Sequence, residues 1–422
     1  MRLHKSLDLP MAEKPRVLLI CTLDLMAWVL LRPWWQALLG AGYEVHLACS
    51  ASGYFERLAR GGLIVHEVPL RRSLSPLANL RALWVLCWLM VRHRYAIVNT
   101  HSPVAAAVGR TAAWLCRVPA IYTVHGFHFH DDMPWVSRRF FVAIESLLGR
   151  ITRHFMFVSK EDQCAALREG IARRVDATTW ICNGIDLQSF PPKSTRLAEA
   201  DAIRTSLRIP GDAPVVGIVA RIVKEKGYQE FFEMAAAISA VRPSCVFLVV
   251  GDALPSDRGS FARQFRAHVR AAGLEDRFRF TGFTDCVAGF LQVMDVFVLP
   301  SYREGFPRSV LEAMGSELPV VTANIRGCRE SVVDGITGLL VPPRDSKALT
   351  SAVLSLLDNS ELRRRMGQAG RSRVQELYDE RFVQHRITCV FERLLGGVGA
   401  GGETRQARGC AASPQDHTRS PA

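Results

Sequence analysis

Short apolar runs alternate with longer amphipathic stretches along the first half of the chain. The runs are rich in β-branched residues and predict strands at Arg16–Thr22, Glu44–Cys49, Ile64–Pro69, Ile97–Thr100, Ile121–Val124 and His154–Ser159. The longer stretches predict helices between them, among which are Pro33–Ala41, Leu77–Arg92 and Val104–Cys116. Continuous apolar strands joined by helical crossovers are typical of a parallel sheet that is covered on both faces.

The alternation pauses at Pro191–Pro210, where three prolines and no strong strand pattern indicate a linker with some helix. A second series of apolar runs then predicts strands at Val215–Ala220, Val246–Gly251, Phe278–Thr281, Val296–Leu299, Val320–Thr322 and Leu339–Val341. Helical stretches follow at Lys347–Leu357, Ser360–Gly370 and Val374–Leu395. Two consecutive doubly wound units predict two α/β lobes that face each other across a cleft.

These patterns divide the chain into six segments. We expect a flexible N-terminus at 1–14, a Rossmann-like first lobe at 15–190, a linker at 191–210, a Rossmann-like second lobe at 211–373, a C-terminal helix at 374–395 that packs back toward the first lobe, and a disordered Gly/Ser/Pro-rich tail at 396–422. Ligands of such sheets bind beyond the carboxyl ends of the strands, so the cleft is the expected place for chemistry.

The net charge of +13 favours the first lobe, because residues 1–190 carry 22 lysines and arginines against 14 acidic residues. A basic lobe fits an anionic membrane surface or a phosphorylated substrate, and a solvated basic face without a partner is the alternative. No nucleic-acid-binding motif accompanies the charge, so nucleic acid is not an expected partner.

Cysteine spacing and the lengths of the apolar runs indicate where the protein works. The 11 cysteines contain no C-x-x-C pair, which favours reduced thiols over a disulfide framework or a zinc ribbon. No apolar run reaches the roughly 18–20 residues that span a bilayer, and the first residues lack the apolar core of a secretory signal. We therefore expect a cytoplasmic protein, peripheral at most on the inner face of the plasma membrane.

The densest polar cluster is PSYREGFPRSVLEAMGSE at 300–317, which follows an apolar strand and opens a helix. A strand, a polar loop and a helix N-terminus in that order present free backbone N–H groups and a positive dipole end to an anion. Glu304 lies in the loop and Glu312 within the helix, a separation that suits two hydroxyl-bearing parts of one extended ligand. The alternative is a solvated helix preceded by a polar loop.

A second cluster, VARIVKEKG at 219–227, follows the first strand of the second lobe. Arg221 and Lys226 stand five residues apart in a loop, and a helix is predicted to begin after Gly227. Two cations beside a helix entry suit a diphosphate, since arginine binds as a fork and lysine as a point charge. Solvated loop cations are the alternative.

Histidines follow two strands of the first lobe. His125 ends the strand Ile121–Val124 beside Gly126, and this position suits a general base, a hydrogen-bond donor or a ligand. His101, after Ile97–Thr100, is a second candidate that faces the cleft. The loop spacing of His125, His128 and His130 is poor support for a metal site, and simple packing is the alternative for both strand-end histidines.

Several motifs are absent from the sequence. It contains no D-x-D pair for a nucleotide-bound metal ion, no Walker P-loop and no G-x-S-x-G elbow. Dehydrogenase, kinase and hydrolase readings therefore lose their usual support.

Taken together, the chain resembles a family 4 glycosyltransferase of the GT-B fold, and within it the branch that builds capsular polysaccharide, O-antigen and lipid-linked glycans. Glu304 to Glu312 fits the E-x7-E motif of that family, Arg221 to Gly227 fits its R-x4-K-G motif, and TVHGFHF at 123–129 fits the strand-end His-Gly of the branch. The opening LLICTLDLMAW…LLGAGYEVHLAC fits its first β–α–β unit. The Gly-Gly pair that many relatives carry after the first strand is missing from Thr22–Trp28, which leaves the phosphate contacts of the first lobe unassigned.

The resemblance implies a role for each matching position. The implied catalytic residues are His125 and Glu304, and His101 is the candidate on the acceptor side. The implied donor site consists of Arg221 and Lys226 on the diphosphate, Glu304, Gly305, Phe306 and Pro307 around the sugar, Glu312 on the ribose, and Thr281, Gly282 and Phe283 at the base.

The implied activity is retaining, metal-independent transfer of a sugar from a UDP-sugar to a glycan acceptor, linked to undecaprenyl diphosphate, in cell-surface polysaccharide biosynthesis. No metal or other cofactor is expected, because cationic side chains and a helix N-terminus take the place of a metal in this family. Two alternatives stay open: a UDP-sugar epimerase of the same fold, which acts without an acceptor, and a non-catalytic UDP-sugar-binding partner subunit.

Overall fold

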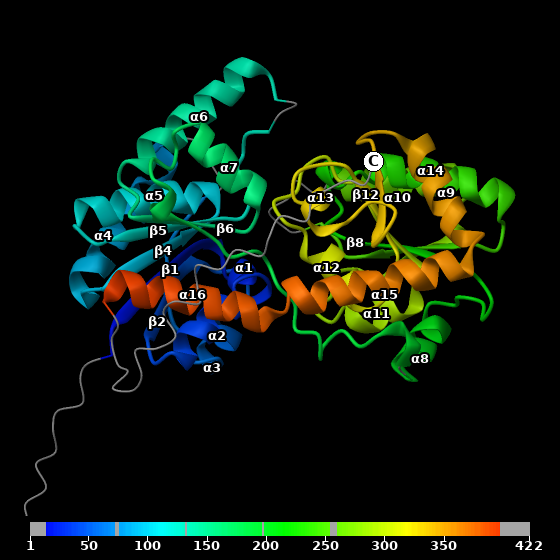
Figure 1. The fold of residues 1–422 in the computed structure, drawn as a ribbon, viewed down its shortest axis with the longest axis horizontal. Coiled ribbons are helices and arrows are strands. Elements are labelled where there is room, and N and C mark those ends of the chain that lie inside the picture. The colour runs from blue at the N-terminus through cyan, green and yellow to red at the C-terminus, as the bar shows by residue number, and fades with distance from the viewer. Residues whose placement is uncertain (1–13, 72–75, 131–132, 196–197, 254–259, 397–422) are drawn as a thin grey trace, which may run out of the picture.

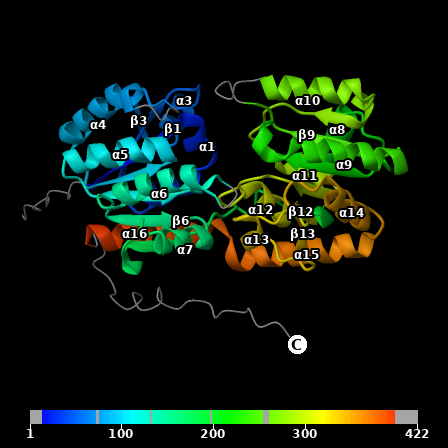
Figure 2. The ribbon, with the colours of Figure 1, turned by 90° about the horizontal axis from the view of Figure 1, so that it is seen from above.

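The computed structural model describes residues 14–71, 76–130, 133–195, 198–253 and 260–396. The N-terminus and the tail, expected to be flexible, lie almost wholly outside these residues. The described chain forms two α/β lobes that stand side by side, as the sequence predicts (Figure 1). Figure 2 shows helices on both faces of each sheet.

The first lobe is built on a seven-stranded parallel sheet in the order β3-β2-β1-β4-β5-β6-β7. Its strands are β1 (Arg16–Leu23), β2 (Glu44–Ser50), β3 (Ile64–Glu67), β4 (Ile97–His101), β5 (Ala120–Val124), β6 (His154–Phe157) and β7 (Thr178–Trp180). Six of them confirm the predicted strands, whereas β7 was not predicted because three residues carry no readable alternation. The strand order reverses between β1 and β4, which opens a crevice at their carboxyl ends.

The second lobe has a six-stranded parallel sheet in the order β10-β9-β8-β11-β12-β13. Its strands are β8 (Val215–Val219), β9 (Val246–Val250), β10 (Phe278–Phe280), β11 (Val296–Leu299), β12 (Val320–Ala323) and β13 (Gly338–Val341), all of them predicted. Most of their side chains are fully buried because helices cover both faces. The order reverses between β8 and β11, so the second lobe has a crevice of its own.

Helices connect the strands in both lobes. The first lobe contains α1 (Asp24–Val29), α2 (Arg32–Gly40), α3 (Phe55–Arg60), α4 (Leu80–His93), α5 (Pro103–Leu115), α6 (Trp135–Gly149) and α7 (Lys160–Arg168). The following helices are α8 (Ala198–Ser206), α9 (Tyr228–Val241), α10 (Ser260–Ala271), α11 (Ala288–Val293), α12 (Arg308–Gly315), α13 (Cys328–Ser331), α14 (Ser346–Leu357), α15 (Ser360–Leu377) and α16 (Glu380–Leu395). Helix α8, in the predicted linker, packs on α11 of the second lobe.

The prediction of one helix at Val374–Leu395 is wrong. Helix α15 continues to Leu377, the chain turns, and α16 begins at Glu380 with Asp379 accepting a hydrogen bond from the amide of Arg381. The turn forms because the carbonyl of Tyr378 accepts from the amide of Ile185 instead of continuing the helix. Helix α16 crosses to the first lobe and packs on α2 (Figure 1).

None of the helices within the described residues is long and apolar enough to cross a bilayer.

Candidate donor site between the lobes

A cavity of about 790 Å³ lies between the two lobes. The first lobe contributes the segment around α1 and α2, including Trp28 and Arg32. The second lobe contributes the loops after β8, β9 and β10 and the start of α12. Of the residues singled out from the sequence, Arg221, Lys226, Phe283 and Glu312 line this cavity.

Lys226 and Glu304 meet although 78 positions separate them. The Nζ atom of Lys226 lies 2.6 Å from Oε1 of Glu304, and the hydroxyl of Ser301 donates to the same oxygen at 2.7 Å. Gly227 makes this approach possible, because it has φ +71° and a Cβ there would lie 2.0 Å from the carbonyl oxygen of Pro300. The R-x4-K-G and E-x7-E segments therefore form one site.

Three cationic side chains of the second lobe line the cavity and suit an anionic ligand. Arg221 and Lys226 come from the loop after β8, and Arg308 comes from the first residue of α12. Arg308 also donates from Nη1 to the carbonyl of Val29, 3.0 Å away in the first lobe. The sequence argument missed Arg308, although it stands between the two glutamates of the E-x7-E spacing.

Glu312 lies in α12 with 14% of its side chain exposed, and its Oε1 is 3.7 Å from Nε of Arg308. Burial raises the pKa of Glu312, and the charge of Arg308 opposes this change. A buried carboxylate beside a cavity is costly unless polar groups pair with it, so a ligand with hydroxyl groups suits this position.

His125 and His101 form a buried pair at the carboxyl ends of β5 and β4. Nδ1 of His101 lies 3.0 Å from Nε2 of His125, and the ring of Trp34 packs 5.5 Å from that of His125. Burial lowers the pKa of His125 to about 3, and burial together with His125 lowers the pKa of His101 well below its usual range. Both rings are therefore neutral at physiological pH. Neither lines the 790 Å³ cavity.

The lobes touch backbone to backbone beside this pair. A Cβ on Gly305 would lie 2.0 Å from the carbonyl oxygen of His125, and a Cβ on Gly126 would lie 2.9 Å from the Cα of Gly305. Behind them, Phe306 is buried against Tyr378, and its carbonyl accepts from Nδ2 of Asn183 at 2.7 Å. Pro307 precedes α12 as its N-terminal cap residue. The Glu304–Pro307 loop is thus pressed against the first lobe.

The candidates for the base follow β10. Phe283 lines the cavity and is 49% exposed, whereas Thr281 and Gly282 lie outside its lining. The amide of Gly251 donates to the carbonyl of Gly282 at 3.0 Å, which ties the β9 and β10 loops together. These two residues therefore shape the loop behind Phe283.

A buried carboxylate that the sequence argument missed organises the glycine-free loop after β1. Asp24 accepts from the amide of Tyr54 at 2.8 Å and from the hydroxyl of Ser52. It also accepts from the amide of Leu25 in the first turn of α1. Helix α1 therefore begins directly after β1, and it presents Trp28 and Val29 to the cavity.

Comparisons with known proteins agree with this arrangement. The model of the family Glycosyltransferase Family 4 matches residues 34–189, and that of Glycosyl transferases group 1 matches residues 199–373. The chain is 27% identical over 325 residues to the UDP-Gal:alpha-D-GlcNAc-diphosphoundecaprenol alpha-1,3-galactosyltransferase of Escherichia coli, covering 76% of this chain and 81% of that protein. It is 26% identical over 343 residues to the capsular polysaccharide biosynthesis glycosyltransferase CapM of Staphylococcus aureus, covering 79% and 86%.

Among solved structures, Anabaena HepE in complex with UDP-glucose is similar with a TM-score of 0.75 at 20% identity, covering 90% of this chain and 99% of that one. This likeness confirms the expected GT-B fold. Each lobe thus matches a different glycosyltransferase model, and the two models meet at the predicted linker. The chain belongs to the glycosyltransferases, with a family 4 domain in its first lobe and a group 1 domain in its second.

Proposed function

We propose that this protein transfers a sugar from a UDP-sugar to a glycan carried on a lipid diphosphate, with retention of anomeric configuration and without a metal ion. The cavity between the lobes is the observation that carries the proposal, because Arg221, Lys226 and Arg308 line it together with the carboxylate of Glu312. The named activity of the E. coli relative and the UDP-glucose complex of HepE support UDP as the nucleotide.

The cations account for a metal-independent reaction. As the bond from the sugar to the diphosphate breaks, negative charge develops on the leaving UDP. Arg221, Lys226 and Arg308 stand as fixed positive groups in the cavity where this charge would form. Arginine binds phosphate oxygens as a fork and lysine as a point charge, so the set supplies the stabilisation that a divalent ion gives elsewhere.

The histidine pair and Glu304 would act on the sugar. A neutral His125 can donate one hydrogen bond and accept another, and among the described residues its Nδ1 has no partner. The contact between Gly126 and Gly305 brings the backbones of the two lobes together beside His125. The described state is therefore closed, and donor entry requires the lobes to separate before they close again around it.

A membrane-bound acceptor fits the outer face of the first lobe. Helices α4 and α6 expose Trp84, Trp88 and Trp135, with 69%, 53% and 75% of their surface accessible. A cavity of about 1120 Å³ beside α5 is lined by the arginines Arg117, Arg150, Arg153, Arg173, Arg174 and Arg393. Exposed tryptophans and a cavity lined by arginines on the same lobe suit the interface of an anionic bilayer.

Thermal unfolding with UDP, ADP and GDP tests the donor site. A ligand at about 100 times its Kd adds roughly 2.7 kcal/mol to the free energy of unfolding, which raises the Tm visibly. UDP is expected to raise the Tm with EDTA present, and Arg221→Ala is expected to remove this shift. If no nucleotide changes the Tm, the donor assignment is wrong.

Product analysis separates transfer from epimerisation. We expect sugar to move from a UDP-sugar to a lipid diphosphate acceptor and no UDP-sugar to change configuration when the acceptor is left out. Epimerised donor in the acceptor-free reaction would favour the epimerase reading, and UDP-sugar binding with neither product would favour the partner-subunit reading.

Flotation with vesicles tests the membrane contact. Vesicles that contain phosphatidylglycerol are expected to carry the protein at low salt, and Trp84→Ala/Trp88→Ala is expected to abolish this binding. Val241→Ala, which shortens an exposed apolar side chain of the second lobe, is the control and should bind like the wild type. Wild-type protein that stays unbound at low salt would remove the membrane contact from the proposal.

A further inference from the structure

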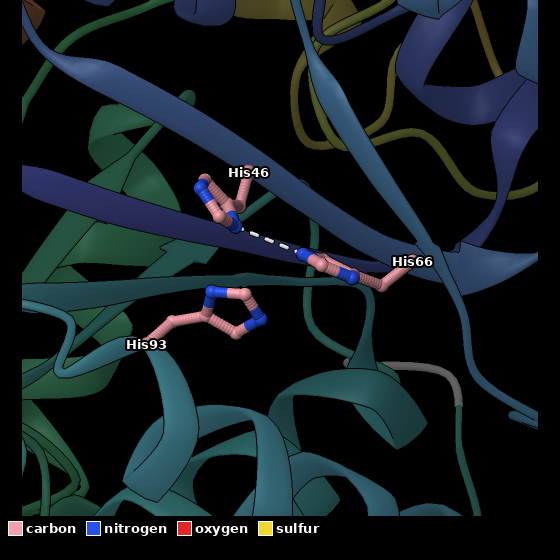
Figure 3. A group of neighbouring side chains, drawn as sticks. All are labelled: His46, His66 and His93. Atoms are coloured by element: carbon pink, nitrogen blue, oxygen red, sulfur yellow. Dashed lines mark hydrogen bonds between the residues drawn. The ribbon is translucent and has the colours of Figure 1, made fainter.

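A second group of histidines lies in the first lobe, away from the cavity between the lobes. His46 comes from β2, His66 from β3 and His93 from the last turn of α4 (Figure 3). One ring nitrogen of each lies within 4.8 Å of the others. Helix α4 leads into β4, so His93 stands at the amino end of that strand, opposite the end that carries the cleft.

We propose that His46, His66 and His93 bind a zinc ion that fastens the edge of the first sheet to α4. A zinc ion bonds imidazole nitrogen at about 2.0–2.1 Å, which places two nitrogens of a tetrahedral site about 3.3 Å apart. Nδ1 of His46 and Nε2 of His66 are 2.8 Å apart, and the three nitrogens together span at most 4.8 Å. Small rotations of the rings bring all three to the bonding distance.

The hydrogen bonds behind His46 direct its free electron pair toward the other two rings. Its Nε2 lies 2.8 Å from Oε1 of Glu44, and a carboxylate oxygen there accepts the ring proton. The proton is therefore held on Nε2, and Nδ1 faces His66 as an acceptor. A carboxylate that orients a histidine in this way is the usual support of a zinc ligand.

Arg16 connects this support to the third ligand. Its Nε donates to Oε1 of Glu44 at 2.9 Å, and its Nη1 donates to the carbonyl of His93 at 3.2 Å. The charge of Arg16 is thus paired with Glu44, and the same side chain holds the backbone of His93 in place. Burial lowers the pKa of all three histidines, that of His66 to about 4, so each offers the neutral imidazole that a metal requires.

Nδ1 of His46 has two neighbours at hydrogen-bond distance, and the hydroxyl of Tyr95 also lies 3.4 Å from Nε2 of His66. Nδ1 of His46 can accept one in-plane hydrogen bond, yet both Nε2 of His66 and the hydroxyl of Tyr95 lie 2.8 Å from it. With an ion bound, His46 and His66 both direct electron pairs at the metal, and the Tyr95 hydroxyl can donate to a water in the fourth position. Three imidazoles without a thiolate favour Zn²⁺, Cu²⁺ or Ni²⁺ over Mg²⁺ or Ca²⁺.

The place of the cluster gives the ion a structural consequence. Strand β3 is the outermost strand of its sheet and only four residues long, so one side has no neighbouring strand. A metal bound to β2, β3 and α4 joins this edge to the helix layer. Metal binding to the folded state alone stabilises the fold by mass action.

The test is zinc binding to the full chain, freed of metal with EDTA and without a polyhistidine tag. Isothermal titration with zinc chloride is expected to show one site with a Kd in the micromolar range or below. The variant His66→Gln/His93→Gln should weaken binding about 100-fold or more, because two of three ligands are lost. The control His268→Gln replaces a histidine of α10 and should bind like the wild type.

A second measurement covers the case in which the double variant does not fold. Cobalt replaces zinc and absorbs strongly in the visible range only when four ligands surround it tetrahedrally. The wild type is expected to show these strong bands, and the single variant His93→Gln should lose them. Zinc binding of equal strength in wild type and double variant, or weak octahedral cobalt bands in the wild type, would overturn the proposal.

Discussion

Two histidine groups of the first lobe, the His101–His125 pair and the His46–His66–His93 triad, stand at opposite ends of one sheet and differ in where their ring nitrogens point. In the pair, His101 and His125 use one nitrogen on each other, and the remaining two, Nε2 and Nδ1, have no partner among the described residues. In the triad of His46, His66 and His93, one nitrogen of each ring points to a common centre. Glu44 accepts a hydrogen bond from the opposite nitrogen of His46. Burial lowers the pKa of every histidine in both groups. Among the residues that the structure describes, only the triad has a carboxylate that bonds to one of its rings, so the pair suits a substrate and the triad suits an ion.

The largest expected effect is a loss of catalytic activity when the histidine pair is changed, with no comparable loss for a histidine outside it. His125→Asn should lower kcat/KM about 100-fold, the size of effect seen when one preorganised hydrogen-bonding group is removed from an active site. His154→Gln is the matched control, since His154 is another buried histidine of the same sheet and bonds to Thr179. Steady-state kinetics with UDP-sugar and acceptor measure both variants. Equal losses in the two would remove the pair from the reaction.

Removal of zinc by a chelator is expected to change the thermal stability that depends on the triad and to leave donor binding unchanged. Removing zinc with EDTA should lower the Tm, while the rise in Tm on adding UDP should remain. Zinc at about 100 times its Kd adds roughly 2.7 kcal/mol to the free energy of unfolding, and EDTA withdraws this contribution. Differential scanning fluorimetry with and without each ligand gives the four values required. A UDP shift that disappears with EDTA would contradict metal-independent donor binding.

The pH dependence of the free energy of unfolding tests whether His125 of the pair stays neutral in the folded state. The folded state keeps His125 neutral to about pH 3, whereas an unfolded histidine titrates near 6.5. The unfolded state therefore binds more protons as the pH falls, and the stability present above about pH 6.5 is lost below it. The titration of His125 alone should lower the free energy of unfolding by about 2 kcal/mol between pH 7.5 and pH 5.

Urea unfolding at the two pH values measures this loss. His125→Asn should show a smaller decrease in the free energy of unfolding than the wild type, because one titrating group is gone. An unchanged decrease would mean that His125 is accessible to protons in the folded state.

The smallest expected effect concerns the support of the triad. Glu44→Gln keeps the size of the side chain but weakens its hold on the proton of His46, so zinc affinity should fall about tenfold. The measurement is the same isothermal titration, with kcat followed in parallel. A drop in kcat together with zinc affinity would show that the two ends of the sheet are coupled.

The sequence predicted residues that line the cavity from the second lobe better than those that line it from the first lobe. Arg221, Lys226 and the Glu304–Glu312 segment belong to short motifs that follow strands, and parallel strands bring such segments to one edge. The triad could not be found in this way, because its members lie 20 and 27 positions apart and look like isolated histidines. They meet through the register of β2 and β3, in which Ala48 pairs with His66 and His46 stands two residues earlier.

The contacts between the lobes could not be predicted from the sequence either. Periodicity assigns elements to each sheet but does not orient one lobe against the other. Glu330 illustrates the gap: its carboxylate accepts from the amides of Lys160 and Glu161 at the N-terminus of α7, across the cleft. The break after Leu377 was missed for the same reason, since Ile185 from a distant segment ends the helix there.

That meeting of Ile185 and Tyr378 determines how the molecule can move. The chain passes between the lobes twice, and the two passages are bonded to each other: the Ile185 amide donates to Tyr378, and the amide of Glu380 donates to Ile185, each at 3.0 Å. Because these two hydrogen bonds join the passages, one passage cannot move at this place without the other. A rotation of one lobe against the other would therefore bend both passages at this one place.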